Sequence, residues 1–401
     1  MNTARKISDD LYYVGASDRR LALFENVYPI ERGVSYNSYL VLDEETVLMD
    51  TVDHAVSREF LENVEAVLGG RKLDYLVVNH MEPDHCAVIA DLVLRYPDLK
   101  IVGNAKTIQF IKQFYSFDVD PHAKIVKDGD VLTTGSHSFK FVFAPMVHWP
   151  EVMVAFDLST GNLFSADAFG TFGALAGNLY ADEVNFDKDW LDDARRYYIN
   201  IVGKYGVQAT NLLKKAAGLP IKMILPLHGP IWRKDLGYFI GKYLAWAGYQ
   251  PEEKGLVIVY SSIYGNTANA MDVLAAKCAD LGIKDIHMYD ASKTDVSYLV
   301  AEAFRFSTLV VASPTYNADI FPKMEMFMIE LKAHNFSNRD VAVFENGTWA
   351  ISAGKKMTEY LSAMKNINIL APCVTVKSSL KPEQLSALDD VAALLAKSVN
   401  G

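Results

Sequence analysis

The stretch Asn79-His80-Met81-Glu82-Pro83-Asp84-His85-Cys86 contains the side chains that decide the first part of the fold. It follows the apolar run 73–78, which is typical of a buried strand. Pro83 cannot continue a strand, so we expect a stiff loop from which the neighbouring side chains converge. Imidazole and carboxylate groups at this spacing suit a transition metal, and so many neighbouring ligands leave room for two ions. The candidate ligands in this stretch are His80, Glu82, Asp84 and His85.

Three further candidate ligands each stand just after an apolar run. His148 follows 139–144, Asp167 follows 163–165, and His228 follows 221–227. Taken singly, Asp167 could cap a turn, and each histidine could be a hydrogen-bonded core residue. Together with the first cluster, they predict a metal site at one rim of a sheet sandwich, where the strand ends meet.

Strand-like and helical segments alternate through the first part of the chain, which predicts a layered αββα sandwich. Helices are expected over 56–68, 87–96, 105–115 and 234–248, together with a long helical stretch over 182–218 that breaks near 203–206. Aromatic residues of this region, including Tyr197, are expected to pack in the core or at an interface. The polar segment 250–255 marks a boundary between a first domain, 1–250, and a second domain, 254–401.

The second domain shows a regular alternation of strands and helices. Strands are expected over 256–260, 285–289, 308–312, 341–344 and 372–376, and helices over 268–281, 296–304, 321–333, 354–366 and 382–397. This order predicts a doubly wound parallel sheet of five strands. Such a sheet binds its ligands at the carboxyl ends of the strands.

The loop after the first of these strands predicts a phosphate site. Its hydroxyl groups and its glycine lead straight into a helix, whose backbone N–H groups and dipole face an anion. Because the loop lacks a lysine, a nucleoside triphosphate is not expected, and a mononucleotide such as FMN is. Loops after the third and fourth strands add backbone amides and aromatic rings near the expected flavin ring. The candidate cofactor-binding residues are Ser261, Ser262, Ile263, Tyr264, Gly265, Asn266 and Thr267, then Pro314, Thr315, Tyr316 and Asn317, then Asn346, Gly347, Thr348 and Trp349.

Composition limits the classes of partner. The net charge of −10 argues against nucleic acid and anionic membranes as partners. No apolar run is long enough to span a bilayer, and residues 1–10 carry no signal-peptide core, so we expect a cytoplasmic protein. The three cysteines form no Cys-x-x-Cys motif, so a four-thiolate iron site is not expected, and electrons must come from a separate donor.

The order His-x-Glu-x-Asp-His, then His, then Asp, then His-Gly resembles the metallo-β-lactamase-like domain of flavodiiron proteins. Hydrolases of that fold generally carry a histidine where Glu82 stands, and the added carboxylate favours iron over zinc. The resemblance implies that one iron binds His80, Glu82 and His148, that the other binds Asp84, His85 and His228, and that Asp167 bridges them. In that family the position of His85 does not always coordinate the metal.

The loops of the second domain are similar to those of flavodoxins and of the flavodoxin-like half of flavodiiron proteins. By this resemblance, Ser261 and 264–267 hold the FMN phosphate, while 314–317 and 346–349 flank the isoalloxazine ring. The fourth-strand loop departs from the commoner Gly- and Tyr-rich version. The family implies reduction of dioxygen to water, nitric oxide to nitrous oxide, or both, with electrons from rubredoxin or a similar carrier. It also implies a head-to-tail homodimer or a dimer of dimers, in which the FMN of one chain approaches the two irons of its partner.

Two other functions compete with this interpretation. A binuclear zinc hydrolase with a flavodoxin-like docking module would share the fold, although Glu82 argues against it. A pure electron carrier would use the first domain only as a scaffold. Between dioxygen and nitric oxide the motifs do not decide, and dioxygen is slightly favoured.

Overall fold

The computed structural model describes residues 2–401, which form two compact units. The first unit comprises the chain up to Tyr198 together with Tyr205–Leu244, and the second comprises Ile199–Lys204 and Ala245–Gly401. In the described part of the chain, none of the helices combines the length and the apolar character needed to cross a bilayer.

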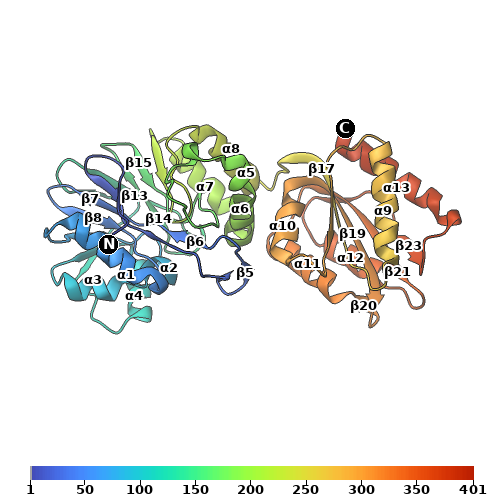
Figure 1. The fold of residues 1–401 in the computed structure, drawn as a ribbon, viewed down its shortest axis with the longest axis horizontal. Coiled ribbons are helices and arrows are strands. Elements are labelled where there is room, and N and C mark those ends of the chain that lie inside the picture. Colours follow the sequence, from blue (N-terminus) through green and yellow to red (C-terminus); the bar gives the residue numbers. More distant parts are fainter. Residues whose placement is uncertain (1) are drawn as a thin grey trace. The chain divides into compact units, whose positions relative to one another are not determined.

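Two facing sheets build the centre of the first unit (Figure 1). The larger sheet has the order β1-β2-β7-β8-β9-β10-β11, and the smaller has the order β12-β13-β14-β15-β16. The larger sheet consists of β1 (Arg5–Lys6), β2 (Leu11–Tyr13), β7 (Tyr39–Leu42), β8 (Thr46–Met49), β9 (Tyr75–Val77), β10 (Lys100–Gly103) and β11 (Ala123–Ile125). The smaller consists of β12 (Val131–Thr133), β13 (Ser138–Phe143), β14 (Met153–Asp157), β15 (Asn162–Phe164) and β16 (Met223–Leu225). Two short ribbons pair β3 (Ala16–Asp18) with β6 (Val34–Tyr36), and β4 (Leu23–Phe24) with β5 (Tyr28–Pro29).

Helices cover the outer faces of both sheets, which gives the αββα layers that the sequence predicts (Figure 1). The left-handed Gly69, with φ +57°, ends α1, and the Asn104 side chain caps α4 by accepting from the N–H groups of Lys106 and Thr107. The helices are α1 (Ser57–Leu68), α2 (Pro83–Cys86), α3 (Ile89–Arg95), α4 (Ala105–Phe114), α5 (Phe186–Asp189), α6 (Leu191–Tyr197), α7 (Gly206–Ala216) and α8 (Leu236–Ala247). Short 3₁₀ turns lie at His54–Val56, Ala181–Glu183 and Gly203–Tyr205.

The long helical stretch expected over 182–218 is divided more often than the sequence predicts. It breaks near residues 203–206 as expected, but a further break falls at Trp190, and a π-helical turn spans Tyr198–Val202. Trp190 ends α5 with φ −134°, which an α-helix cannot accommodate.

The second unit contains the predicted parallel sheet, in the order β18-β17-β19-β21-β22. Its strands are β17 (Glu253–Tyr260), β18 (Ile286–Asp290), β19 (Phe306–Tyr316), β21 (Arg339–Gly347), β22 (Ile367–Ile369) and β23 (Val374–Lys377), with a short antiparallel β20 (Asp319–Ile320). The fifth strand is interrupted, because β22 and β23 both pair with β21 on either side of Pro372, which cannot donate to the ladder.

Helices pack on both faces of this sheet (Figure 1). The helices are α9 (Asn266–Asp280), α10 (Val296–Arg305), α11 (Pro322–Ala333), α12 (Ala353–Ser362) and α13 (Leu385–Asn400), with a 3₁₀ turn at Pro382–Gln384. Leu256 and Ile258 of β17 are fully buried against Leu274 of α9 and Leu388 of α13. The carboxyl ends of the parallel strands therefore meet at one edge, as a doubly wound sheet requires.

Candidate metal centre and cofactor pocket

The seven candidate metal ligands of the first unit come from loops and one short helix at the ends of four strands. They follow β9, β13, β15 and β16, and the structure brings them together in two groups. The loop expected around Pro83 is instead one turn of helix, α2, with Pro83 in its first turn. Proline fits there because the first turn needs no N–H donor. Asp84 and His85 therefore project from a helical turn rather than from an extended loop.

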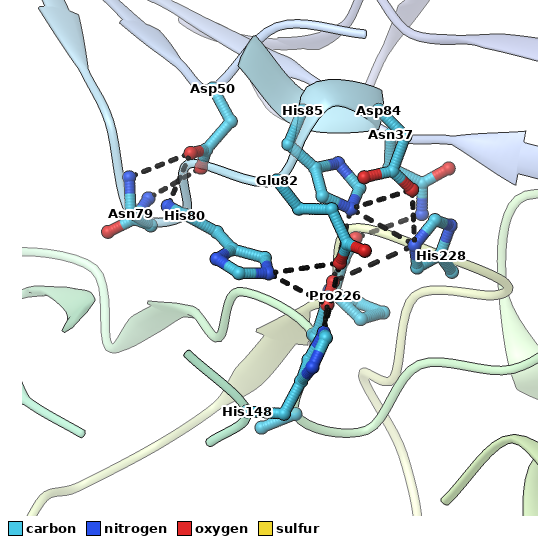
Figure 2. A network of polar contacts seen from close by, with 12 residues as sticks. Asn37, Asp50, Asn79, His80, Glu82, Asp84, His85, His148, Pro226 and His228 are labelled. Carbon is cyan, nitrogen blue, oxygen red and sulfur yellow. Dashed lines mark hydrogen bonds and ion pairs between the residues drawn. The ribbon is translucent and has the colours of Figure 1, made fainter. Parts of the chain in front are cut away.

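The first group consists of His80, Glu82, His148 and Asp167. Oε2 of Glu82 lies 3.3 Å from Nε2 of His80 and 3.0 Å from Nε2 of His148 (Figure 2). Oδ2 of Asp167 lies 3.3 Å from Nε2 of His80 and 3.2 Å from Nε2 of His148. Two imidazole nitrogens and two carboxylate oxygens thus converge on one point.

The second group consists of Asp84, His85 and His228. Nε2 of His85 and Nε2 of His228 lie 3.0 Å apart, and each lies 3.4 Å from Oδ2 of Asp84 (Figure 2). Oδ1 of Asp167 lies 3.1 Å from Nε2 of His85 and 3.7 Å from Nε2 of His228. Asp167 therefore turns one oxygen toward each group.

Hydrogen bonds on the far side of two imidazole rings set which nitrogen faces the centre. Nδ1 of His80 lies 2.8 Å from Oε1 of Glu151, so it carries the proton and Nε2 presents its lone pair to the carboxylates. Nδ1 of His228 donates in the same way to the carbonyl oxygen of Ser35, at 2.8 Å. An outward N–H and an inward lone pair are the arrangement that metal-binding histidines have.

These donors fit metal ions. Lone pairs of nitrogen and oxygen at about 3 Å repel each other unless a proton or a metal ion lies between them. Both carboxylate oxygens of Asp84, and Oδ1 of Asp167, are buried and accept no hydrogen bond from the described residues. Buried anionic oxygens without hydrogen bonds are costly, and a cation removes that cost. Carboxylate and imidazole donors suit iron and related transition metals.

The electrostatic surroundings of Asp167 and His148 also favour a bound cation. Burial disfavours the ionised form of Asp167, but His85 and His80 outweigh it and hold the pKa of this carboxyl group well below its usual value. Burial likewise opposes protonation of His148, while Asp167 and Glu82 raise its pKa to about 9. Asp167 is therefore held ionised, as a metal ligand must be, and the carboxylates favour a positive charge beside them, which a bound cation would supply.

Several residues that support these groups are missing from the sequence prediction. Asp50, after β8, accepts the backbone N–H of Asn79 at 2.7 Å and that of His80 at 3.1 Å (Figure 2). Nδ2 of Asn37 donates to the carbonyl of Pro226 at 2.9 Å and shapes the loop of His228. Asp50 stands at a strand end like the ligands, so the rule that found those could have found it. For Glu151, the sequence contains no comparable pattern.

Tyr197 and Glu25 also lie at this site. Tyr197 is fully buried in the expected way, but its ring packs 5.4 Å from that of His228, and its hydroxyl group has no hydrogen-bond partner among the described residues. Glu25 is in the turn between β4 and β5 and is solvent-accessible. Loss of water around its carboxyl group, the larger cause, and the negative charge of neighbouring Glu82, the smaller one, raise the pKa of Glu25 to about 8.

The second unit has a cavity of about 390 Å³ at the carboxyl ends of its strands. Of the cofactor-binding candidates, Ser262, Ile263, Tyr264, Asn266, Thr267, Pro314, Thr315, Asn317, Asn346, Gly347, Thr348 and Trp349 line it. Ser261 is fully buried away from the lining, Gly265 forms the N-cap of α9 with φ +89°, and Tyr316 packs on Phe321 outside it. Ala318, Ala350 and Ser378 line the cavity although the sequence analysis does not select them.

The lining of this cavity fits a flavin mononucleotide. Its floor is the N-terminus of α9, where Oγ of Ser262 accepts from the backbone N–H groups of Gly265 and Ala268 and shapes the turn. The first N–H groups of this helix suit a phosphate. Tyr264 and Trp349 are 91% and 80% exposed, so both rings are free to cover a planar ligand.

Comparison with known proteins agrees with both units. Residues 34–229 match the protein family described as ODP family beta lactamase. The anaerobic nitric oxide reductase flavorubredoxin of Aeromonas hydrophila subsp. hydrophila is 30% identical over 387 residues, covering 94% of this chain and 76% of that relative.

Solved structures agree over nearly the whole chain. The rubredoxin oxygen:oxidoreductase of Desulfovibrio gigas has a TM-score of 0.92 and 28% identity, covering 99% of each chain. The flavodiiron protein of Giardia intestinalis has a TM-score of 0.94, covering 100% of this chain and 97% of its own, and at 24% identity it supports the fold alone. These matches confirm the predicted metallo-β-lactamase-like and flavodoxin-like architecture. The chain therefore belongs to the flavodiiron protein family of oxidoreductases.

Proposed function

We propose that this protein reduces dioxygen to water, or nitric oxide to nitrous oxide, at a pair of irons that receives electrons through FMN. The observation that carries the proposal is the position of Asp167. This carboxylate turns Oδ2 toward one imidazole–carboxylate group and Oδ1 toward the other, at 3.2 Å from His148 and 3.1 Å from His85. Such a carboxylate suits two metals that share one small substrate.

The two groups suggest a ligand assignment. We assign His80, Glu82 and His148 to one iron, Asp84, His85 and His228 to the other, and Asp167 to both. Glu82 adds an anionic oxygen donor, which favours iron over zinc. When bound, two irons and FMN would supply four electrons, which with four protons match reduction of dioxygen to two waters, while two electrons and two protons convert two nitric oxides to nitrous oxide and one water.

The chain's own residues prepare the site for this chemistry. Glu151 and the Ser35 carbonyl hold His80 and His228 with their Nε2 atoms directed inward. Burial of Asp167, which is 1% exposed, keeps water from competing with a small ligand. The Tyr197 hydroxyl, buried beside His228 without a hydrogen-bond partner among the described residues, is available to donate to a molecule bound there.

In the second unit we propose that the loop Ser261–Thr267 holds the FMN phosphate, and that 314–317 and 346–349 flank the ring. The placement of Ser262, Asn266 and Thr267 around the N-terminus of α9 supports the phosphate assignment. We keep 1–250 and 254–401 as the diiron and FMN domains.

The comparisons suggest the partners. Because one relative is named a flavorubredoxin and one similar structure a rubredoxin oxygen:oxidoreductase, we propose a rubredoxin-type electron donor. We further propose a head-to-tail homodimer, alone or paired into a tetramer, in which each FMN serves the irons of the other chain.

The test is metal and flavin analysis of the purified protein, followed by turnover of both gases with one reduced donor. We expect about two irons and one FMN per chain, and consumption of dioxygen, nitric oxide or both. Asp167→Asn should abolish this activity, whereas Asp9→Asn, the same change at a fully exposed side chain, should not. Zinc without flavin absorbance would favour the hydrolase, and full activity in Asp167→Asn would refute the metal site.

A further inference from the structure

Ser378, directly after β23, has an unusual backbone conformation. Its φ angle is +65°, in the left-handed region that residues with a side chain rarely adopt, at a cost of roughly 1–2 kcal/mol. A glycine would adopt this conformation without that cost. Residues held in such conformations are found at ligand-binding positions when the surrounding structure fixes them.

Three hydrogen bonds fix Ser378 in this conformation. Its backbone N–H donates to the Gly347 carbonyl at 3.2 Å, and its own carbonyl accepts from Nδ2 of Asn346 at 3.1 Å. Its hydroxyl group pairs with that of Thr348 at 3.0 Å. Since Asn346 is only 5% exposed, the clamp is anchored to a buried side chain of the cavity lining.

The same clamp connects Ser378 to both loops of the cavity, to one directly and to the other through Asn346. Nδ2 of Asn346 also donates to Oγ1 of Thr267, at 3.2 Å, in the loop proposed for the phosphate. Thr348 belongs to the loop proposed for the ring. Ser378 hydrogen-bonds Asn346 and Thr348 of that loop, is linked to Thr267 through Asn346, and lines the cavity itself, so it lies where the ring loop meets the phosphate loop. In FMN, the part between phosphate and ring is the ribityl chain, which carries hydroxyl groups.

The Ser378–Thr348 pair matches such a polyol chemically. Each hydroxyl group has one donor and two acceptor positions, and the contact between them uses one donor and one acceptor. One O–H and several lone pairs remain for a ligand in the cavity. The hydroxyl groups of a sugar alcohol both donate and accept hydrogen bonds, so they can pair with the free O–H and with the free lone pairs.

We propose that Ser378, through its hydroxyl group, is a binding residue for the ribityl chain of the flavin. This inference rests on the proposed FMN site and extends it to the fifth strand of the sheet. The strained backbone of Ser378 is then explained, because such strain persists at ligand-binding positions that the surrounding structure fixes. Ser378 acts on cofactor binding and contacts neither the phosphate loop backbone nor the metal centre.

The test measures flavin affinity of the apoprotein by quenching of flavin fluorescence, with FMN and with lumiflavin, which has a methyl group in place of the ribityl chain. Ser378→Ala should weaken FMN binding about fivefold, the effect of one lost hydrogen bond, and leave lumiflavin binding unchanged. Ser378→Gly should weaken FMN binding equally while its urea midpoint stays the same or rises, because the backbone strain disappears.

The matched control is Ser307→Ala, at the opposite end of β19 from the cavity, where FMN affinity should not change. Unchanged FMN affinity in both Ser378 variants would overturn the inference and leave the FMN site intact. An equal loss of lumiflavin binding would also overturn it, because the hydroxyl group would then act on the ring or the fold. Wild-type protein that binds no FMN would overturn the proposed function and this inference together.

Discussion

Glu151 decides which nitrogen of His80 faces the carboxylates. Its Oε1 accepts from Nδ1 of His80 and from the backbone N–H of Met81, both at 2.8 Å. It therefore holds the ring and the start of the ligand loop together. At the scale of single residues, the site depends on such partners behind the ligands as much as on the ligands themselves.

Replacing Glu151 should weaken the metal site without removing any ligand. Glu151→Ala should lower metal affinity about 10- to 100-fold, because His80 loses the partner that fixes its tautomer. Glu151→Gln retains an oxygen acceptor and should have a smaller effect. Iron content after dialysis against graded chelator measures this, and Glu44→Gln, an exposed glutamate before β8, is the control. Equal iron retention in Glu151→Ala and wild type would contradict the role.

Tyr197→Phe should lower catalytic activity without lowering the stability of the fold. The hydroxyl group has no hydrogen-bond partner among the described residues, so its removal should leave the unfolding midpoint unchanged or slightly raised. If it donates to the bound substrate, kcat should fall about a hundredfold or more. Turnover and urea denaturation of the same preparation test this, with Tyr13→Phe, at another buried tyrosine in β2, as the control. A wild-type kcat would assign Tyr197 to packing alone.

At the scale of elements, His137 joins two strands of the smaller sheet through the buried Asp157 and reaches the larger sheet through the partly exposed Asp10. His137, directly before β13, lies 2.7 Å from Asp157 at the end of β14 and 2.9 Å from Asp10, directly before β2. His137 is 3% exposed and Asp157 is 1% exposed. The hydrogen bond to Asp157, against the effect of burial and with help from Asp10, raises the pKa of His137 to about 9.

This bridge should make stability depend on pH. Because the folded-state pKa of His137 lies above the value of about 6.5 for an exposed histidine, its contribution is complete below about pH 6.5 and disappears as the pH rises through 9. The pKa values of Asp10 and Asp157 are lowered, so their contribution is lost as the pH falls into the acid range.

His137→Gln should therefore cost about 3 kcal/mol of unfolding free energy at pH 6, because it leaves Asp157 buried without a charged partner. The difference from wild type should shrink between pH 7 and pH 10. Urea denaturation across this range measures it, and His54→Gln, at an exposed histidine, is the control. A difference that stays constant up to pH 10 would show that the imidazole is not charged in the folded protein.

At the scale of the whole molecule, two compact units hold two different sites. The candidate metal ligands all belong to the first unit, and the residues lining the proposed FMN cavity all belong to the second. The two sites therefore lie in separate compact units. Binding of each cofactor should stabilise the unit that holds it.

Differential scanning calorimetry should show a separate unfolding transition for each unit. FMN at about 100 times its Kd adds about 2.7 kcal/mol to the unit that binds it, which raises its transition by roughly 5–10 °C. Iron should shift the other transition and leave the FMN-dependent one in place. A single transition that both cofactors shift equally would contradict independent units.

The sequence predicts this fold well because its patterns are local. Strands alternate with helices from Leu256 onward, and ligand-type side chains follow apolar runs at His148 and His228. Both patterns are visible within a few neighbouring residues. The divided helical stretch near Trp190 and the interrupted fifth strand at Pro372 deviate because packing and a missing N–H override local preference.

By itself, the sequence determined the residue types of the candidate metal ligands and their positions at strand ends, since both can be recognised from a few neighbouring residues. Only the tertiary structure decided which nitrogen of each histidine faces inward, that Glu151 stands behind His80, and that Ser378 joins the cavity. The physical reason is that a tautomer or a strained backbone angle is set by hydrogen bonds from partners far along the chain. Such partners meet only after the strands have paired.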